Sequence, residues 1–343
     1  MSPLVFLASF AQGGALPPEP GELHLRRMHQ LTFGGQNAEA YFSASGKLLI
    51  FQRQGPAEQC DQMYVMGVDG GGLHRVSAGR GRTTCGYFYD RDRRVFYSST
   101  EHASADCPPR PDYSQGYVWA LYDYDIYTAN ADGSGARRLT TNPDYDAEGT
   151  LSPDGKTIVF TSLRDGDLDI YTMSADGSNL RRLTTTLGYD GGPFFSPDGK
   201  KIVYRAYHPQ RAADTLEYRS LLTQRLVRPT HMDLWVMNAD GSDQHQVTHL
   251  PGASFAPYFH PDGRRIIFSS NYRSPESRDF DLFLVNADGT GLEQVTTAPG
   301  FDAFPMFSPD GKELVWASNR LGTAPHETNI FIAEWVERPL PPH

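Results

Sequence analysis

Residues 152–184 read SPDGKTIVFTSLRDGDLDIYTMSADGSNLRRLT, and this stretch decides the fold. It opens with a Pro-Asp-Gly turn and continues with two runs of β-branched and aromatic residues. It then passes through an Ala-Asp-Gly turn to a short run that ends in Arg-Leu-Thr. Both turns place glycine at a position that favours a positive φ. With the apolar run before the first turn, the unit is typical of four short antiparallel strands, here called a, b, c and d.

The same unit occurs six times along the chain. Its first turn returns as SPDGK at 196–200 and 308–312, as HPDGR at 260–264, and in the weaker forms SASGK at 43–47 and YDRDR at 89–93. Runs such as KIVYR and RIIFS follow these turns, and runs such as DIYTA and DLFLV come next. Four short strands with two hairpin turns, repeated in this way, predict the blades of a β-propeller.

The two ends of the repeat array predict how the ring closes. The sixth copy stops after its third strand, near Trp335, and residues 27–32 (RMHQLT) resemble the fourth strand of an earlier copy. An N-terminal strand that completes the last blade would remove an open sheet edge. We therefore predict an all-β fold: a single six-bladed β-propeller over residues 27–336, with an N-terminal linker at 12–26 and a C-terminal tail at 337–343.

The pattern SPDGK, IVFTS, DIYTM, ADGS, RRLT resembles the PD40 (WD40-like) repeat of the periplasmic protein TolB and its relatives. The same repeat forms the propellers of prolyl-oligopeptidase-like proteins. The resemblance covers nearly the whole chain. It implies a TolB-like propeller whose function depends on the site that it carries rather than on the fold.

Composition and the N-terminus bear on location. Asp and Glu outnumber Lys and Arg by 41 to 31, and no Lys/Arg-rich block is present, which argues against a nucleic-acid partner. No apolar run is long enough to be a transmembrane segment.

Residues 3–10 are apolar, and Ser9 and Ala11 fit a small-residue cleavage site. We expect residues 1–11 to be a signal-peptide-like export segment and the protein to be periplasmic or extracellular. The alternative is a frayed apolar tail.

The chain has three cysteines, Cys60, Cys85 and Cys107, at spacings that match no zinc or redox motif. In an oxidising compartment, one disulfide and one free thiol are the simplest arrangement. We predict that Cys107 pairs with Cys60 or with Cys85.

The order of strands places the connections on two faces. The a–b and c–d turns share one face, here called the turn face. The d–a and b–c connections share the other, here called the loop-bearing face. Two b–c connections are long, at 101–124 in blade 2 and at 207–231 in blade 4. The first is rich in Tyr and Trp, and it is either an aromatic platform for a ligand or a self-packed loop. In the second, residues 212–226 predict a short helix, either a lid or a cover for apolar surface.

One polar residue stands six positions before each a–b turn, at the start of the innermost strand. These residues are Asn37, Thr83, Asp146, Asp190, Ser254 and Asp302. Glu39 and Glu148 stand two positions further on, and Arg164 and Arg320 follow strand b. We expect all ten to form a ligand-binding ring at the loop-bearing end of the channel. Asp146, Asp190 and Asp302 are candidate ligands for an axial Ca²⁺. The alternative is a hydrated channel with carboxylate–arginine pairs.

These observations favour an exported, monomeric binding propeller that takes a peptide or a partner protein at the loop-bearing mouth of its channel. The alternative is a metal-assisted lyase or hydrolase that acts on carbohydrate or peptide. A third reading is a sensor or structural propeller with no small ligand. No GxSxG motif supports a nucleophilic serine. The sequence leaves open the identity of the ligand and whether the protein is catalytic.

Overall fold

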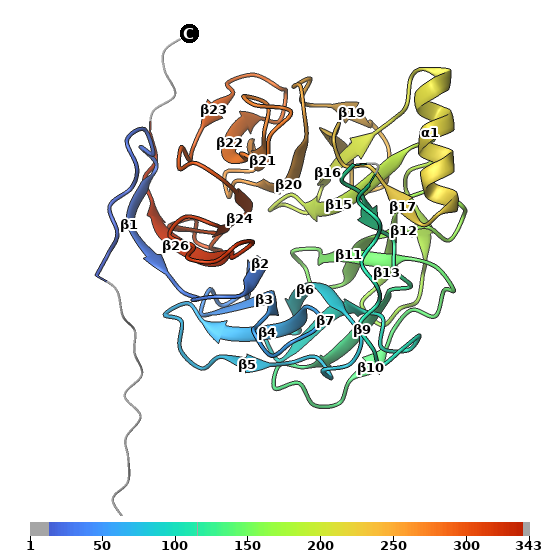
Figure 1. Ribbon diagram of the computed structural model, residues 1–343, viewed down its shortest axis with the longest axis horizontal. Helices are drawn as coiled ribbons and strands as arrows, with labels where there is room; N and C mark the ends of the chain where they lie inside the picture. Colours follow the sequence, from blue (N-terminus) through green and yellow to red (C-terminus); the bar gives the residue numbers. More distant parts are fainter. Residues whose placement is uncertain (1–13, 115, 339–343) are drawn as a thin grey trace, which may run out of the picture.

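The computed structural model of the protein describes residues 14–114 and 116–338, and in it six four-stranded antiparallel sheets surround a central axis (Figure 1). The predicted signal segment at 1–11 lies outside the described residues. Blade 1 consists of β2 (Gln36–Phe42), β3 (Leu48–Gln54), β4 (Gln62–Gly67) and β5 (His74–Arg75). Blade 2 consists of β6 (Thr83–Tyr89), β7 (Arg94–Ser99), β9 (Asp125–Asn130) and β10 (Arg137–Arg138). Blade 3 consists of β11 (Asp146–Leu151), β12 (Thr157–Ser162), β13 (Asp169–Ser174) and β14 (Arg181–Arg182).

The second half of the chain repeats this order. Blade 4 consists of β15 (Tyr189–Phe195), β16 (Lys201–Tyr207), β18 (Asp233–Asn238) and β19 (His245–Gln246). Blade 5 consists of β20 (Ser254–Phe259), β21 (Arg265–Ser270), β22 (Asp281–Asn286) and β23 (Glu293–Gln294). Blade 6 consists of β24 (Asp302–Phe307), β25 (Glu313–Ser318), β26 (Asn329–Trp335) and β1 (Leu25–Gln30). The predicted all-β, six-bladed fold is confirmed.

The ring closes as the sequence predicts, because β1 pairs antiparallel with β26, with Leu25 opposite Trp335 and Gln30 opposite Phe331. Figure 1 shows these two strands, from opposite ends of the chain, side by side in one blade. The strand begins two residues earlier than expected. Residues before it also contact the propeller: Leu16 donates its N–H to the carbonyl of Met28 at 2.7 Å.

The repeated residues of the sequence hold each blade together. In blade 2, Thr140 donates its hydroxyl proton to Asp125 at 2.7 Å and accepts the N–H of Ile126 at 2.9 Å. These two hydrogen bonds fix the end of strand d, which has the sequence RLT, to the start of strand c, which has the sequence DIYT. The corresponding pairs in the other blades are Gln62 and Ser77, Asp169 and Thr184, Asp233 and Thr248, Asp281 and Thr296, and Asn329 and Thr32.

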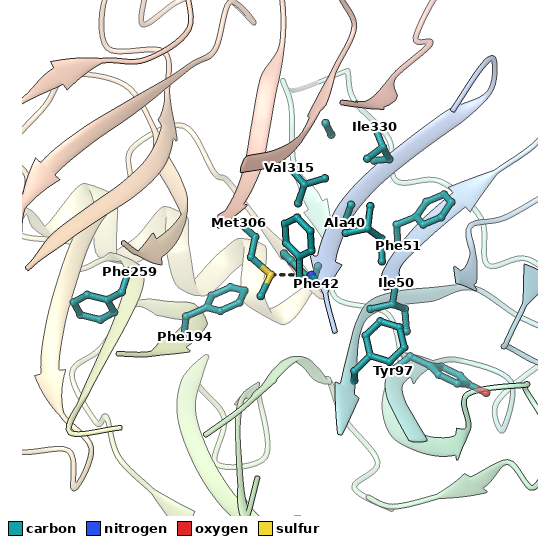
Figure 2. Packing of buried hydrophobic residues seen from close by; sticks show 14 of the residues in the cluster. Ala40, Phe42, Ile50, Phe51, Tyr97, Phe194, Phe259, Met306, Val315 and Ile330 are labelled. Carbon is teal, nitrogen blue, oxygen red and sulfur yellow. Dashed lines mark hydrogen bonds between the residues drawn. The ribbon is translucent and has the colours of Figure 1, made fainter. Parts of the chain in front are cut away.

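Apolar side chains from neighbouring blades interleave to form the core. Figure 2 shows Phe42, Ile50 and Phe51 of blade 1 beside Met306 and Val315 of blade 6. Phe42 also donates its N–H to the Met306 sulfur at 3.1 Å. Ile50, Phe51 and Val315 are completely buried, so the inter-blade contacts supply much of the hydrophobic stabilisation.

The two long b–c connections pack against each other. In blade 2, β8 (Trp119–Ala120) pairs antiparallel with β17 (Leu226–Val227) of the blade 4 connection. The predicted helix is α1 (Ala212–Thr223), and it buries Tyr218, whose hydroxyl donates to Asp167 at 2.6 Å. Figure 1 shows α1 at the periphery of the ring, so it covers apolar surface instead of closing the axis. Within the described residues, no helix is long and apolar enough to cross a bilayer.

A disulfide joins Cys60 to Cys107, and Cys85 is free. The disulfide ties the b–c connection of blade 2 to blade 1, and its two cysteines are 47 residues apart in the sequence. The prediction of one disulfide that uses Cys107 is confirmed, and the partner is Cys60.

Replacing this cysteine tests the contribution of the disulfide. We expect Cys107→Ser to reduce the free energy of unfolding by about 2–4 kcal/mol, because the unfolded chain regains the freedom that the crosslink removes. Urea unfolding with and without reductant measures the effect. The variant should be insensitive to reductant, and equal stability of parent and variant under oxidising conditions would contradict the expectation.

Candidate functional site

The residues six positions before each a–b turn are buried and bonded locally. Arg164 donates to Asp146 at 2.8 Å, Arg320 to Asp302 at 2.6 Å, and His208 Nε2 lies 2.9 Å from Asp190. Each of these contacts stays within one blade. Asn37 donates to the carbonyl of Thr328 on blade 6, and Thr83 donates to that of Asp61 on blade 1. Ser254 bonds to the Ser270 hydroxyl of its own blade. Two of the three aspartates therefore form the carboxylate–arginine pairs that the sequence offered as the alternative.

A calcium site at Asp146, Asp190 and Asp302 does not fit this arrangement. Each carboxylate already has its own partner in its own blade. Among residues 14–114 and 116–338, no group of three or more His, Cys, Asp or Glu side chains is placed to hold a metal ion. Burial raises the pKa of all three carboxyls, and the facing arginine acts against this at Asp146 and Asp302. We therefore assign these residues to holding strand a against its neighbours.

A β-bulge in each innermost strand explains this placement. The register of strands a and b shifts in all six blades, and the residue four positions before the turn has a positive φ each time. These residues are Glu39, Cys85, Glu148, Gly192, Ala256 and Phe304, with φ between 50° and 59°. A bulge re-aims side chains locally. All six line a cavity on the axis.

A further ring closes the channel below this level. Two positions before each turn stand Tyr41, Tyr87, Thr150, Phe194, Tyr258 and Met306. The ring of Phe194 lies 5.4 Å from that of Tyr41 and 5.3 Å from that of Tyr258, on other blades. Because these side chains meet across the axis, the channel is divided into two blind cavities. One lies toward the loop-bearing face and the other opens on the turn face.

The cavity on the loop-bearing side is small, about 20 Å³, which is room for about one water-sized group. Glu39, Cys85, Glu148 and Arg205 line one side of it. Ala256 and Phe304, on blades 5 and 6, line the other. The cavity thus has a charged wall and an apolar wall.

Glu148 and Arg205 form a fully bonded buried ion pair. Glu148 also accepts the Thr161 hydroxyl at 2.8 Å and the Gly192 N–H at 2.9 Å. The Arg205 guanidinium lies over the ring of Trp119, 5.1 Å from its centroid, so the blade 2 connection holds it in place. Gly192 leaves room for it, because a Cβ there would stand 2.2 Å from an Arg205 nitrogen and the guanidinium would have to shift.

Glu39 differs from Glu148, because no ion pair in the described part of the chain includes its carboxylate. Burial raises its pKa to about 7, the Cys85 thiol lowers it, and the charge of Glu148 raises it further. Burial also keeps the pKa of the Cys85 thiol well above its usual value, so the thiol stays protonated. Glu39 is therefore an acid that titrates near neutral pH in the channel.

The cavity on the turn face is much larger, about 510 Å³, and residues of all six blades line it. Its floor includes Tyr87, Phe194, Tyr258 and Met306, and Pro153, Pro197, Pro261 and Pro309 stand in its wall. The site residues predicted from the sequence lie toward the loop-bearing face, and none of them lines this cavity. The aromatic residues that stand just before most of the a–b turns are the feature of the sequence that could have predicted it.

The exposed aromatic residues of the blade 2 connection are few. Tyr113 and Tyr117 are 47% and 43% exposed, and their rings stack 5.9 Å apart. The guanidinium of Arg278, from blade 5, lies 4.7 Å from the centroid of Tyr117. Trp119, Tyr122 and Tyr124 pack into the cluster that the two connections share. Most of the connection is thus self-packed, and a small aromatic surface remains.

The closed ring of six four-stranded blades and its blind channel define a β-propeller. Comparisons with known proteins specify the type of repeat. Residues 227–326 match the TolB beta propeller domain, and residues 109–218 match the Tricorn protease N-terminal beta propeller domain. Two stretches of the chain thus match β-propeller models, and the fold is a TolB-like, six-bladed β-propeller.

Solved structures agree with this fold. A TolB-type protein from Agrobacterium tumefaciens is 20% identical, with 89% of this chain and 91% of that chain covered and a TM-score of 0.59. A gluconolactonase from Xanthomonas campestris is 14% identical, with 95% of each chain covered and a TM-score of 0.59. An oligogalacturonate lyase from Vibrio parahaemolyticus is 14% identical, with 90% and 93% covered and a TM-score of 0.54. A search of curated proteins finds no match. At these identities the likeness concerns the fold alone.

Proposed function

We propose that the protein is a binding propeller that works outside the cytoplasm and takes a peptide or partner protein at the loop-bearing mouth of its channel. The observation that carries the proposal is Glu39, a carboxyl in a blind cavity whose neighbouring charges, Glu148 and Arg205, already satisfy each other. A cationic group is the complement that such a site lacks. The disulfide between Cys60 and Cys107 supports an oxidising compartment.

The size of the cavity restricts what enters it. Room for about one water-sized group admits the ammonium end of a lysine side chain, but not a whole ligand. The rest of the ligand would lie on the loop-bearing face. Phe280, Phe301 and Phe304 pack there as partly buried aromatic residues of blades 5 and 6. The ligand that fits is thus a polypeptide with a lysine flanked by apolar residues.

Binding of Nα-acetyl-lysinamide, followed by titration calorimetry, tests this site. We expect Glu39→Gln to weaken binding at least tenfold at pH 8, because the neutral amide removes the charge that faces the ammonium. For the parent, binding should also weaken below pH 7 as Glu39 takes up a proton. Glu276→Gln, an exposed carboxylate change on the same face, is the matched control. Equal binding by the parent and Glu39→Gln would contradict the proposal.

The alternative of a metal-assisted lyase or hydrolase has less support. The described side chains offer no group of three metal ligands, and the predicted axial aspartates are paired within their blades. The lyase and gluconolactonase structures share the fold at 14% identity, which does not extend to their chemistry.

A further inference from the structure

The cavity on the turn face has the lining of a peptide-binding pocket. At about 510 Å³ it is within the range of ligand sites, and the aromatic ring across the axis gives it a closed floor. Aromatic side chains and four proline rings dominate its lining, and its charged members are Asp90, Arg91 and Asp154. Grooves lined by aromatic residues are the sites that recognise proline-rich segments in the polyproline II conformation.

The described chain ends on this same face. Trp335 donates its N–H to the carbonyl of Lys312, which belongs to the a–b turn of blade 6. Two residues later the Glu337 carboxylate lies 2.8 Å from His260 Nε2 and 3.0 Å from the Arg265 guanidinium. Pro261, the residue after His260, lines the cavity. The chain therefore leaves blade 6 beside the a–b turn of blade 5, and Pro261 of that turn lines the cavity.

The sequence that follows has the chemistry that the cavity suits. Residues 338–343 read RPLPPH, and residues 339–343 lie outside the described part of the chain. Three prolines in six residues favour polyproline II, in which six residues span about 19 Å. We propose that residues 338–343 of this chain bind in the cavity on the turn face, with their prolines and Leu340 against its aromatic lining. A proline-rich partner would then have to displace them.

A trans-binding experiment tests this assignment. A chain that ends at Glu337 is titrated with a fluorescent peptide of sequence RPLPPH, and its anisotropy is compared with that of the full chain. We expect the shortened chain to bind the peptide and the full chain to bind it at least tenfold more weakly, because its own segment competes. A peptide with all three prolines replaced by alanine should not bind either chain.

A pair of surface variants locates the binding. Ala44 is exposed and lines the cavity, so Ala44→Arg in the shortened chain should weaken peptide binding at least tenfold. Ala136 is exposed in the c–d turn of blade 2 and is not part of the lining, so Ala136→Arg should bind like its parent. Both alanines are exposed, and unchanged melting temperatures show that both variants are folded.

Three binding results would overturn the proposal. They are no peptide binding by the shortened chain, equal binding by the shortened and full chains, and equal binding by Ala44→Arg and Ala136→Arg. Sedimentation of the two chains distinguishes the source of the segment. A dimer formed by the full chain but not by the shortened chain would assign the occupant to a second copy and reject binding within one chain.

Discussion

Deletion of residues 1–33 is expected to leave the protein largely unfolded at 25 °C. The deletion removes β1 together with the buried side chains of Leu25 and Met28, and it exposes the edge of β26. It also removes Glu22, whose carboxylate lies 2.9 Å from the Arg320 guanidinium. Burial of two large apolar side chains contributes about 1.5–3 kcal/mol each. Loss of the charged hydrogen bonds between Glu22 and Arg320, which keeps Asp302 as a partner, costs about 1.5–3 kcal/mol. The loss approaches the whole stability of a typical domain, about 5–15 kcal/mol.

Circular dichroism during heating measures this effect. The control is a chain that begins at residue 14, which keeps all the contacts described above. Glu22→Gln in the full chain separates the ion pair from the strand and should lower stability by a smaller amount, because β1 remains. If the chains that begin at residues 14 and 34 melt at the same temperature, β1 does not close the ring.

Replacement of Glu39 by glutamine should stabilise the protein above neutral pH. The pKa of Glu39 is raised from 4.5 to about 7, so the folded protein holds this proton more tightly than the unfolded chain does. Stability from this group is complete below about pH 4.5 and is lost as the pH rises to about 7. A shift of this size corresponds to about 3 kcal/mol. The glutamine is neutral at every pH and avoids the cost of a buried charge.

The measurement is the free energy of unfolding of the parent and Glu39→Gln in urea between pH 4 and pH 8. The two should agree near pH 4, and the variant should be more stable by about 3 kcal/mol at pH 8. Burial also raises the pKa of Asp169 and Asp281 to about 7, but both proteins share these groups, so the difference isolates Glu39. A difference that is constant with pH would show that Glu39 titrates normally.

The fold was predictable because each repeat carries its own hydrogen bonds. The aspartate of DIYT and the threonine of RLT bond to each other, and the serine and aspartate of SPDG bond in the turn, as Ser152 and Asp154 do at 2.6 Å. The partner of Cys107 was narrowed to Cys60 or Cys85 because the sequence places all three cysteines on the loop-bearing face, between blades 1 and 2. These features are local, so their sequence signature repeats with them.

The site was less predictable because no residue type in the sequence marks the position of the bulge. The residues with positive φ in the innermost strands are Glu39, Cys85, Glu148, Gly192, Ala256 and Phe304, which are of five different types and include one glycine. An unbroken strand would have turned Asp146 and Glu148 to the same face. The bulge instead leaves Asp146 in the blade with Arg164, while Glu148 faces the channel and pairs with Arg205. Arg205 lies within strand b of blade 4, at the position that Thr161 holds in blade 3. Arg164 comes three positions later in its repeat, where His208 stands in blade 4 and bonds to Asp190.

The antiparallel pairing of β1 with β26 has a mechanical consequence. Leu25 lies opposite Trp335, so the start of one strand and the end of the other are at the same end of the pair. Tension applied between the two ends of the chain would therefore open the pair like a zipper, one hydrogen bond at a time. Strands pulled from opposite ends would resist in shear, with all their bonds loaded together. The seam that completes the ring is thus the place where a pulling force would first open it.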